Sequence, residues 1–106
     1  HMRNREQSIA LVQAAKNGEL EEVSSQLRNG ADVNFTDRDG WSALLGATSE
    51  GHTDVAMRLI QAKADVNDQF KFGKAALHWA AEWGRCELIS ALLGAGADID
   101  KKDADG

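Results

Sequence analysis

The chain repeats itself every 33 residues, with glycine and aspartate recurring in register. The recurring residues are Gly18, Gly51 and Gly84; Gly40, Gly73 and Gly106; and Asp32, Asp65 and Asp98. The units are residues 8–40, 41–73 and 74–106, after an extension over 1–7 whose first two residues resemble a cloning remnant. A fixed period of this length is typical of stacked repeats, because one unit cannot bury its apolar face alone. We therefore expect one domain of three stacked units.

Each unit is predicted to form two short helices and then a hairpin-like finger. In unit three, Leu77 and Ala80 mark one face of a first helix that Gly84 ends. Leu88 and Leu92 mark the second helix. The predicted fold class is an all-α repeat solenoid of helix-turn-helix pairs with β-hairpin or loop fingers.

Composition excludes several classes of protein. A chain of 106 residues has little room for a deep active site. Its formal net charge of −5 argues against nucleic acid as a partner. No apolar run is long enough for a membrane span, so no membrane partner is expected. A single cysteine excludes an internal disulfide and favours a reducing, intracellular location, cytoplasmic or nuclear.

The pattern resembles ankyrin repeats over nearly the whole chain. The segments that carry the resemblance are ALHWAAEWG at 76–84, GADID at 96–100, GADVN at 30–34 and GHTDV at 51–55. The resemblance implies a non-enzymatic protein-interaction module whose concave side is made of the first helices and the finger tips. It also places Asn34 and Asn67 at the position that asparaginyl hydroxylases modify in the family.

Two departures from the family pattern predict a marginally stable fold. The Thr-Pro that precedes the first helix is replaced by Ile9–Ala10, Ser42–Ala43 and Ala75–Ala76. Loss of this cap is expected to weaken each helix start by about 1 kcal/mol. Lys63 stands where the other two units have glycine, so we expect it in a left-handed conformation at a cost of about 1 kcal/mol.

The two ends of the stack differ. Unit one has Glu22 and Gln26 where units two and three have aliphatic residues, as a terminal capping repeat requires. Unit three keeps Leu88, Leu92 and Leu93. An apolar end favours association. We therefore expect either that the chain is the N-terminal part of a longer array or that it self-associates through this end.

No complete catalytic, cofactor or metal motif occurs. Gly94-x-Gly96 lacks the third glycine of a dinucleotide fingerprint, and Gly73-Lys74 lacks the upstream glycine of a phosphate loop. The segment DRDG at 37–40 lacks the glutamate of a calcium loop. Cys86 and His78 occupy ordinary helical repeat positions, which does not suggest a nucleophile and its base. We expect no catalytic residue, no cofactor and no metal.

The repeats also show where binding residues lie, because a core position should hold similar residues in every unit. Trp41 corresponds to serine and lysine, Trp79 to glutamine and glycine, and Trp83 to asparagine and glutamate. No packed core accepts such exchanges, so these rings are expected to face outward. Gly46 is expected to leave space beside Trp79 for an inserted side chain, unless Trp79 itself covers it.

The finger tips differ in character. The tips of units one and three are acidic (DRDG and DADG), whereas FKFG forms the tip of unit two. The acidic tips either form turns or attract a basic partner. We predict that a protein or peptide partner binds the concave face. The predicted contact residues are Trp41, Trp79, Trp83, Phe70, Phe72, Lys71, Arg38, Asp39 and Leu45.

Two alternatives remain open. The aromatic residues, together with Lys71 and Lys74, could stack a nucleotide-like small molecule. The domain could also be a structural spacer within a longer array, with no partner on its concave face.

Overall fold

The computed structural model describes residues 2–69 and 74–98, with side chains from residue 5 onward. Within these ranges the chain forms six helices in three pairs. They are α1 (Met2–Lys16) and α2 (Leu20–Arg28), α3 (Ala43–Ser49) and α4 (Thr53–Gln61), and α5 (Ala76–Trp83) and α6 (Cys86–Gly94). The described residues form no strand. An isolated antiparallel bridge between Gln69 and Ala75 is the one trace of pairing among them, so the predicted β-hairpins are loops there.

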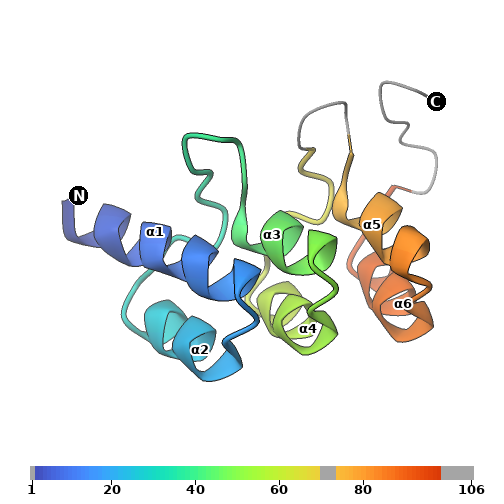
Figure 1. Ribbon diagram of the computed structural model, residues 1–106, viewed down its shortest axis with the longest axis horizontal. Coiled ribbons are helices and arrows are strands. Elements are labelled where there is room, and N and C mark those ends of the chain that lie inside the picture. Colours follow the sequence, from blue (N-terminus) through green and yellow to red (C-terminus); the bar gives the residue numbers. More distant parts are fainter. Residues whose placement is uncertain (1, 70–73, 99–106) are drawn as a thin grey trace.

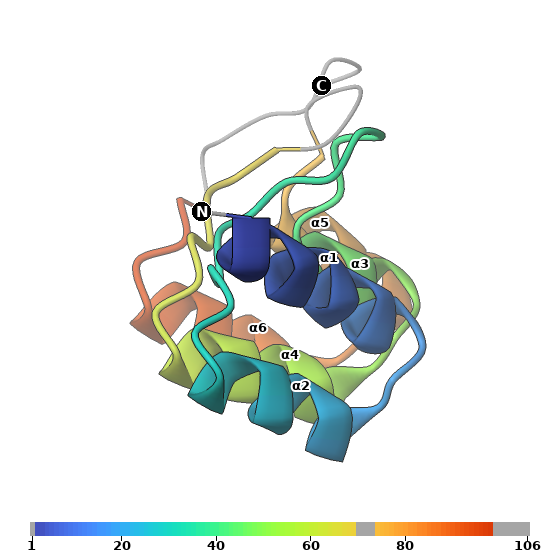
Figure 2. The same cartoon turned by 90° about the vertical axis from the view of Figure 1, so that its left-hand side faces the viewer.

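The pairs stack side by side into a solenoid. The first helices α1, α3 and α5 form one layer, and the second helices α2, α4 and α6 form another (Figures 1 and 2). The segments that follow α2 and α4 rise from the stack on the side of the first helices (Figure 1). The molecule measures 38 × 25 × 21 Å. The all-α repeat solenoid predicted from the 33-residue period is confirmed.

The core runs between the two layers and is continuous through the three units. Its large buried side chains are aliphatic, and alanines in the first helices allow close helix contact. The largest of these aliphatic residues are Leu11, Leu44, Leu45, Leu59, Leu88 and Leu92, with Val12, Val23 and Val55. Burial of this apolar surface supplies the main free energy of folding at about 25 cal/mol per Å².

The regular spacing of the aspartates has a structural cause. The backbone N–H of Asp65 donates to Asn34 Oδ1 at 2.7 Å, and that of Asp98 donates to Asn67 Oδ1 at 2.8 Å. The Asp65 carboxylate in turn accepts from the Asn67 N–H at 2.9 Å. In unit one, Ser8 Oγ holds the corresponding aspartate N–H at 2.8 Å. Asn34 and Asn67 tie their loops to the loop of the next unit, so both have a structural role.

We expect Asn67→Ala to lower the free energy of unfolding by about 1 to 2 kcal/mol. The Asn67 side chain accepts from the Asp98 N–H and also donates to the Gly96 carbonyl oxygen at 3.1 Å. Asn67→Asp keeps the acceptor and should cost less. Urea unfolding followed by circular dichroism measures both losses, and an Asn67→Ala variant as stable as the wild type would contradict this role.

The helix starts differ from the sequence-based expectation. The position of Ile9–Ala10 lies inside α1, so unit one has no helix start there. Ser42 caps α3, since its Oγ accepts from the Leu45 N–H at 3.2 Å. Ala75 offers no side-chain cap, although its own N–H donates to His78 Nδ1 at 2.8 Å. A cap is therefore lost in unit three and kept in unit two. Serine replaces the family's threonine there without loss of the hydroxyl acceptor.

The predicted left-handed conformation of Lys63 and the predicted helix end at Gly84 are confirmed. Lys63 has a φ of 71°, and it is the positive-φ residue other than glycine in the described part of the chain. Gly84 ends α5 with a φ of 67°. Lys63 therefore carries backbone strain of about 1 kcal/mol that a glycine would avoid.

Candidate interaction surface

Trp41 and Trp79 lie together where the first finger returns to the helices. Trp41 stands just before α3 and Trp79 is within α5, and their ring centroids are 5.8 Å apart with an interplanar angle of 39°. Both rings are half-buried and pack against the core. The sequence predicted outward-facing rings; the structure instead shows rings that are partly covered. Their remaining exposed surface forms one aromatic patch, called the tryptophan surface below.

Lys16, at the end of α1, completes this patch. Its Nζ lies 5.2 Å from the centroid of the Trp41 ring, at cation–π distance, and 3.6 Å from Asp37 Oδ2. The lysine stem crosses α3 at Gly46, where an added Cβ would lie 2.8 Å from Lys16 Cγ. The expectation of open space beside Gly46 is therefore wrong, because the lysine stem fills it. Lys16 was not among the predicted contact residues. The one sequence feature that indicates its position is Gly46, a glycine within a helix that leaves space for a neighbouring side chain.

Asp37 shapes the first finger and sets the position of Trp41. Its Oδ1 accepts from the backbone N–H groups of Asp39 and Trp41, both at 2.9 Å. The finger is closed by a bond from the Asp37 N–H to the Trp41 carbonyl oxygen at 2.9 Å. Asp37 thus serves as a turn former. Arg38 and Asp39, at the tip, are exposed and accessible to a partner.

Trp83 occupies a separate place. It is 50% exposed, and its Nε1 donates to the Ser49 carbonyl oxygen at 3.1 Å. Its ring lies against Gly51, where an added Cβ would be 3.4 Å from the ring atoms. Trp83 therefore packs over the end of α3, although it shares α5 with Trp79.

Other predicted contact residues have different outcomes. Leu45 is 1% exposed, so its side chain belongs to the core and is not available to a partner. This corrects the sequence-based prediction. Phe70, Lys71 and Phe72 lie outside the described residues. Lys74 Nζ lies 3.9 Å from Glu82 Oε1, so a carboxylate already compensates its charge.

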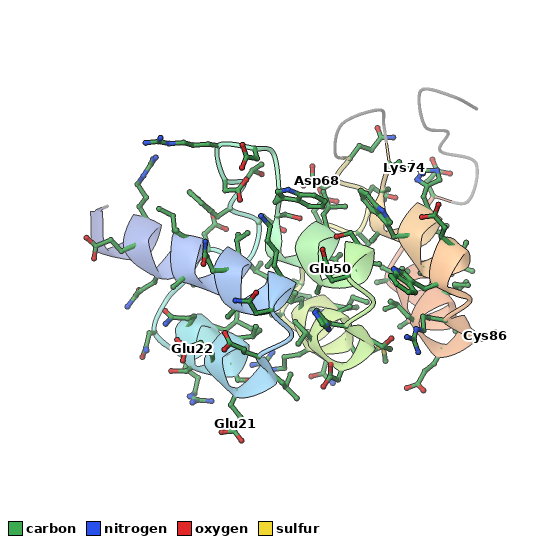
Figure 3. All side chains as sticks on the ribbon, in the orientation of Figure 1. Glu21, Glu22, Glu50, Asp68, Lys74 and Cys86 are labelled. Atoms are coloured by element: carbon green, nitrogen blue, oxygen red, sulfur yellow. The ribbon has the colours of Figure 1, made fainter. Side chains whose placement is uncertain are left out.

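The charged groups are distributed unevenly around the stack. Asp68 and Lys74 lie on the finger side, whereas Glu21 and Glu22 lie beyond α2 on the opposite side (Figure 3). Burial, reinforced by the Asp65 carboxylate, raises the pKa of Asp68, and a hydrogen bond from the Gln69 backbone opposes the shift. The pKa of Asp68 is therefore higher in the folded than in the unfolded chain. The folded state loses stability as the pH rises from the unfolded-state pKa through the folded-state pKa, because Asp68 then ionises. A cation placed beside Asp68 would offset that cost.

The two histidines that the structure describes, His52 and His78, contact backbone groups of neighbouring segments. His78 Nδ1 accepts from the Ala75 N–H, and His52 Nε2 lies 3.0 Å from the Lys16 carbonyl oxygen, so both rings support the backbone. Cys86 is exposed on α6, at the end of the stack (Figure 3). Within residues 2–69 and 74–98, no three metal-binding side chains gather at one place.

The comparisons with known proteins agree with the repeat architecture. A family model described as ankyrin repeats in three copies matches residues 11–103. Among curated proteins, none matches the chain with significant similarity. In the part of the chain that the structure covers, no helix combines the length and apolar character that crossing a membrane requires. The predicted intracellular location stays a prediction.

Proposed function

Because the chain belongs to the ankyrin-repeat family, we propose that it binds an extended peptide or loop of a partner protein across the tryptophan surface. Ankyrin repeats are in general protein–protein interaction modules and are typically not enzymes. The observation that carries the proposal is the partly exposed Trp41–Trp79 pair, at positions where the other units have small or polar residues.

The pair has the properties of a binding anchor. Indole rings offer a large contact area with few rotatable bonds, and tryptophan is enriched among residues that dominate interface free energies. The two rings are also held in place before binding. Asp37 fixes the backbone of Trp41, and Lys16 contacts the ring. A preorganised surface loses less conformational entropy on binding, so more of the contact free energy is kept as affinity.

The charges on the finger side favour a partner with basic residues beside an apolar side chain. Asp39 is exposed at the first tip, and the half-buried Asp68 has a raised pKa. A lysine or arginine of the partner beside Asp68 would restore stabilisation that burial removes. The net charge of −5 would also speed the encounter with a basic partner.

We expect the double substitution Trp41→Ala and Trp79→Ala to weaken binding by about 2 kcal/mol or more, roughly 30-fold. The probe is a peptide selected on the wild-type domain from a random phage-displayed library, and its affinity is measured by calorimetry. Since both rings pack against the core, the variant will also lose some stability. Far-UV circular dichroism therefore has to show that it is folded at the assay temperature.

Trp83→Ala is the matched control. It removes an indole from the same helix but outside the tryptophan surface, so peptide affinity should stay within about twofold. A folded double variant that binds like the wild type would overturn the proposal. A domain that selects no peptide would favour the spacer alternative, and a rise in melting temperature with nucleotides alone would favour the small-molecule alternative. The pairing of Lys16 and Lys74 with carboxylates disfavours that last outcome, because both charges are already compensated.

A further inference from the structure

In the described part of the chain, unit three has a largely apolar face that no other helix pair covers. Four residues form it and are called the end face: His78 and Ala81 on α5, and Ile89 and Leu93 on α6. Ala81 is exposed, Leu93 is 40% exposed, and His78 and Ile89 are half-buried. The end face lines a hollow of about 290 Å³ together with Leu77 and residues of the preceding loop. Within the described residues, α5 and α6 are the last layer of the stack (Figure 1).

The same four positions are covered in the other two units. Each position is found by subtracting 33 or 66 from its number. The equivalents are Leu45, Thr48, Ala56 and Ile60 in unit two, and Val12, Ala15, Val23 and Leu27 in unit one. All of them are buried except Ile60 and Leu27, which are partly buried and pack against the core. The end face is therefore equivalent to the surfaces of units one and two on which the next helix pair stacks.

We infer that the end face binds the end face of a second copy of this chain. A head-to-tail contact, in which unit one of another copy covers the end face, is disfavoured by the chemistry of unit one. There Glu22 and Gln26 occupy the positions where units two and three bury aliphatic residues, and Gln26 Nε2 donates to Glu22 Oε2 at 2.6 Å. Stacking on that surface would bury a carboxylate, which costs several kcal/mol.

Contact between two end faces buries no carboxylate of the four residues, although the Nε2–H of His78, whose Nδ1 accepts from the Ala75 N–H, would need a hydrogen-bond partner there. None of the four residues carries a carboxylate or an ammonium group, but the exposed Asp98 also lines the hollow, so its carboxylate has to stay in contact with water in the dimer. Apolar residues of one copy would meet apolar residues of the other across a two-fold axis, which gives a closed dimer instead of a filament.

The size of the end predicts a weak dimer. The molecule is 25 × 21 Å across its long axis, so two ends bury at most about 1,000 Å² in total. This is near the lower limit of specific interfaces, and we expect a dissociation constant in the micromolar range or weaker. The dimer should leave the tryptophan surface of each copy accessible, since Trp79 contacts Trp41, which stands just before α3, on the side of α5 that faces the preceding unit.

Sedimentation velocity from about 5 µM to about 500 µM tests the inference. The wild type should shift from monomer toward dimer over this range, and Leu93→Glu should remain monomeric because it places a carboxylate at the centre of the contact. Ile9→Glu is the matched control: Ile9 is also 40% exposed, but on α1, and this variant should dimerise like the wild type. The melting temperature of each variant has to show that it is folded.

Any of four results would overturn the inference, three of which concern the wild type and Leu93→Glu. These three are a wild type that stays monomeric at the highest concentration, species larger than a dimer that grow with concentration, and a Leu93→Glu variant that still dimerises. Loss of dimerisation in Ile9→Glu would also overturn it, because the contact would then involve α1. Peptide affinity of Leu93→Glu should equal that of the wild type, so this test is independent of the proposed function.

Discussion

Replacing Leu44 with alanine is expected to lower the free energy of unfolding by about 3 to 4 kcal/mol. Leu44 is 1% exposed in α3, the first helix of the central unit, which contacts both α1 and α5. The substitution leaves a cavity in the central unit, which among the described residues has a helix pair on each side. A domain of this size has a total stability of about 5 to 15 kcal/mol, so the loss should be visible as a large drop in the urea midpoint.

Leu77 provides the matched comparison, because it occupies the same repeat position in unit three. It is half-buried beside the open end face, so Leu77→Ala should cost about half as much. Equal losses at Leu44 and Leu77 would mean that the free energy of packing does not follow burial by neighbouring units.

Gly18→Ala should lower the free energy of unfolding by about 2 to 4 kcal/mol, for two reasons that add. Gly18 has a φ of 74°, which is strained for alanine by about 1 kcal/mol. An added Cβ would also lie 2.7 Å from His52 Nδ1. The His52 ring would have to move away from the Lys16 carbonyl oxygen, which it contacts at 3.0 Å. The junction between units one and two would therefore loosen.

Gly84→Ala separates the two causes. Gly84 stands at the equivalent position of unit three with a φ of 67°, but nothing lies within 4 Å of its added Cβ. This variant should lose only the backbone strain of about 1 kcal/mol. Both losses are measured by urea unfolding, and equal values would contradict the role of His52. In a double-mutant cycle, His52→Ala should cost less in the Gly18→Ala background than alone.

The repeat pattern made much of the fold predictable, because each structural role occurs more than once in the chain. Gly84 has glycine counterparts in both other units, which indicates that the first helix ends there. Lys63 stands where the other two units have glycine, which indicates backbone strain. The polar substitutions at Glu22 and Gln26 identified the outer face of unit one in the same way. A single unit on its own would not have shown which of its residues are constrained by the fold; the other two units show this at the equivalent positions.

The candidate site was less predictable, because its contacts join positions that do not recur. Lys16 reaches Trp41 across Gly46, and each of these three residues is replaced by a different residue type at its own equivalent positions in the other units. Leu45 was predicted to contact a partner but is buried, whereas its equivalent in unit three, His78, is half-buried. Burial at this repeat position depends on whether another unit packs against it, and the type of residue at the position does not show this.

The indole N–H resonances of the three tryptophans test the proposed function most directly. In ¹⁵N-labelled domain, the peaks can be assigned with single Trp→Phe variants and followed while a selected peptide is added. We predict that the peaks of Trp41 and Trp79 move in proportion to the bound fraction, while the Trp83 peak stays in place. Saturating peptide that leaves the Trp41 and Trp79 peaks unmoved would contradict binding at the tryptophan surface.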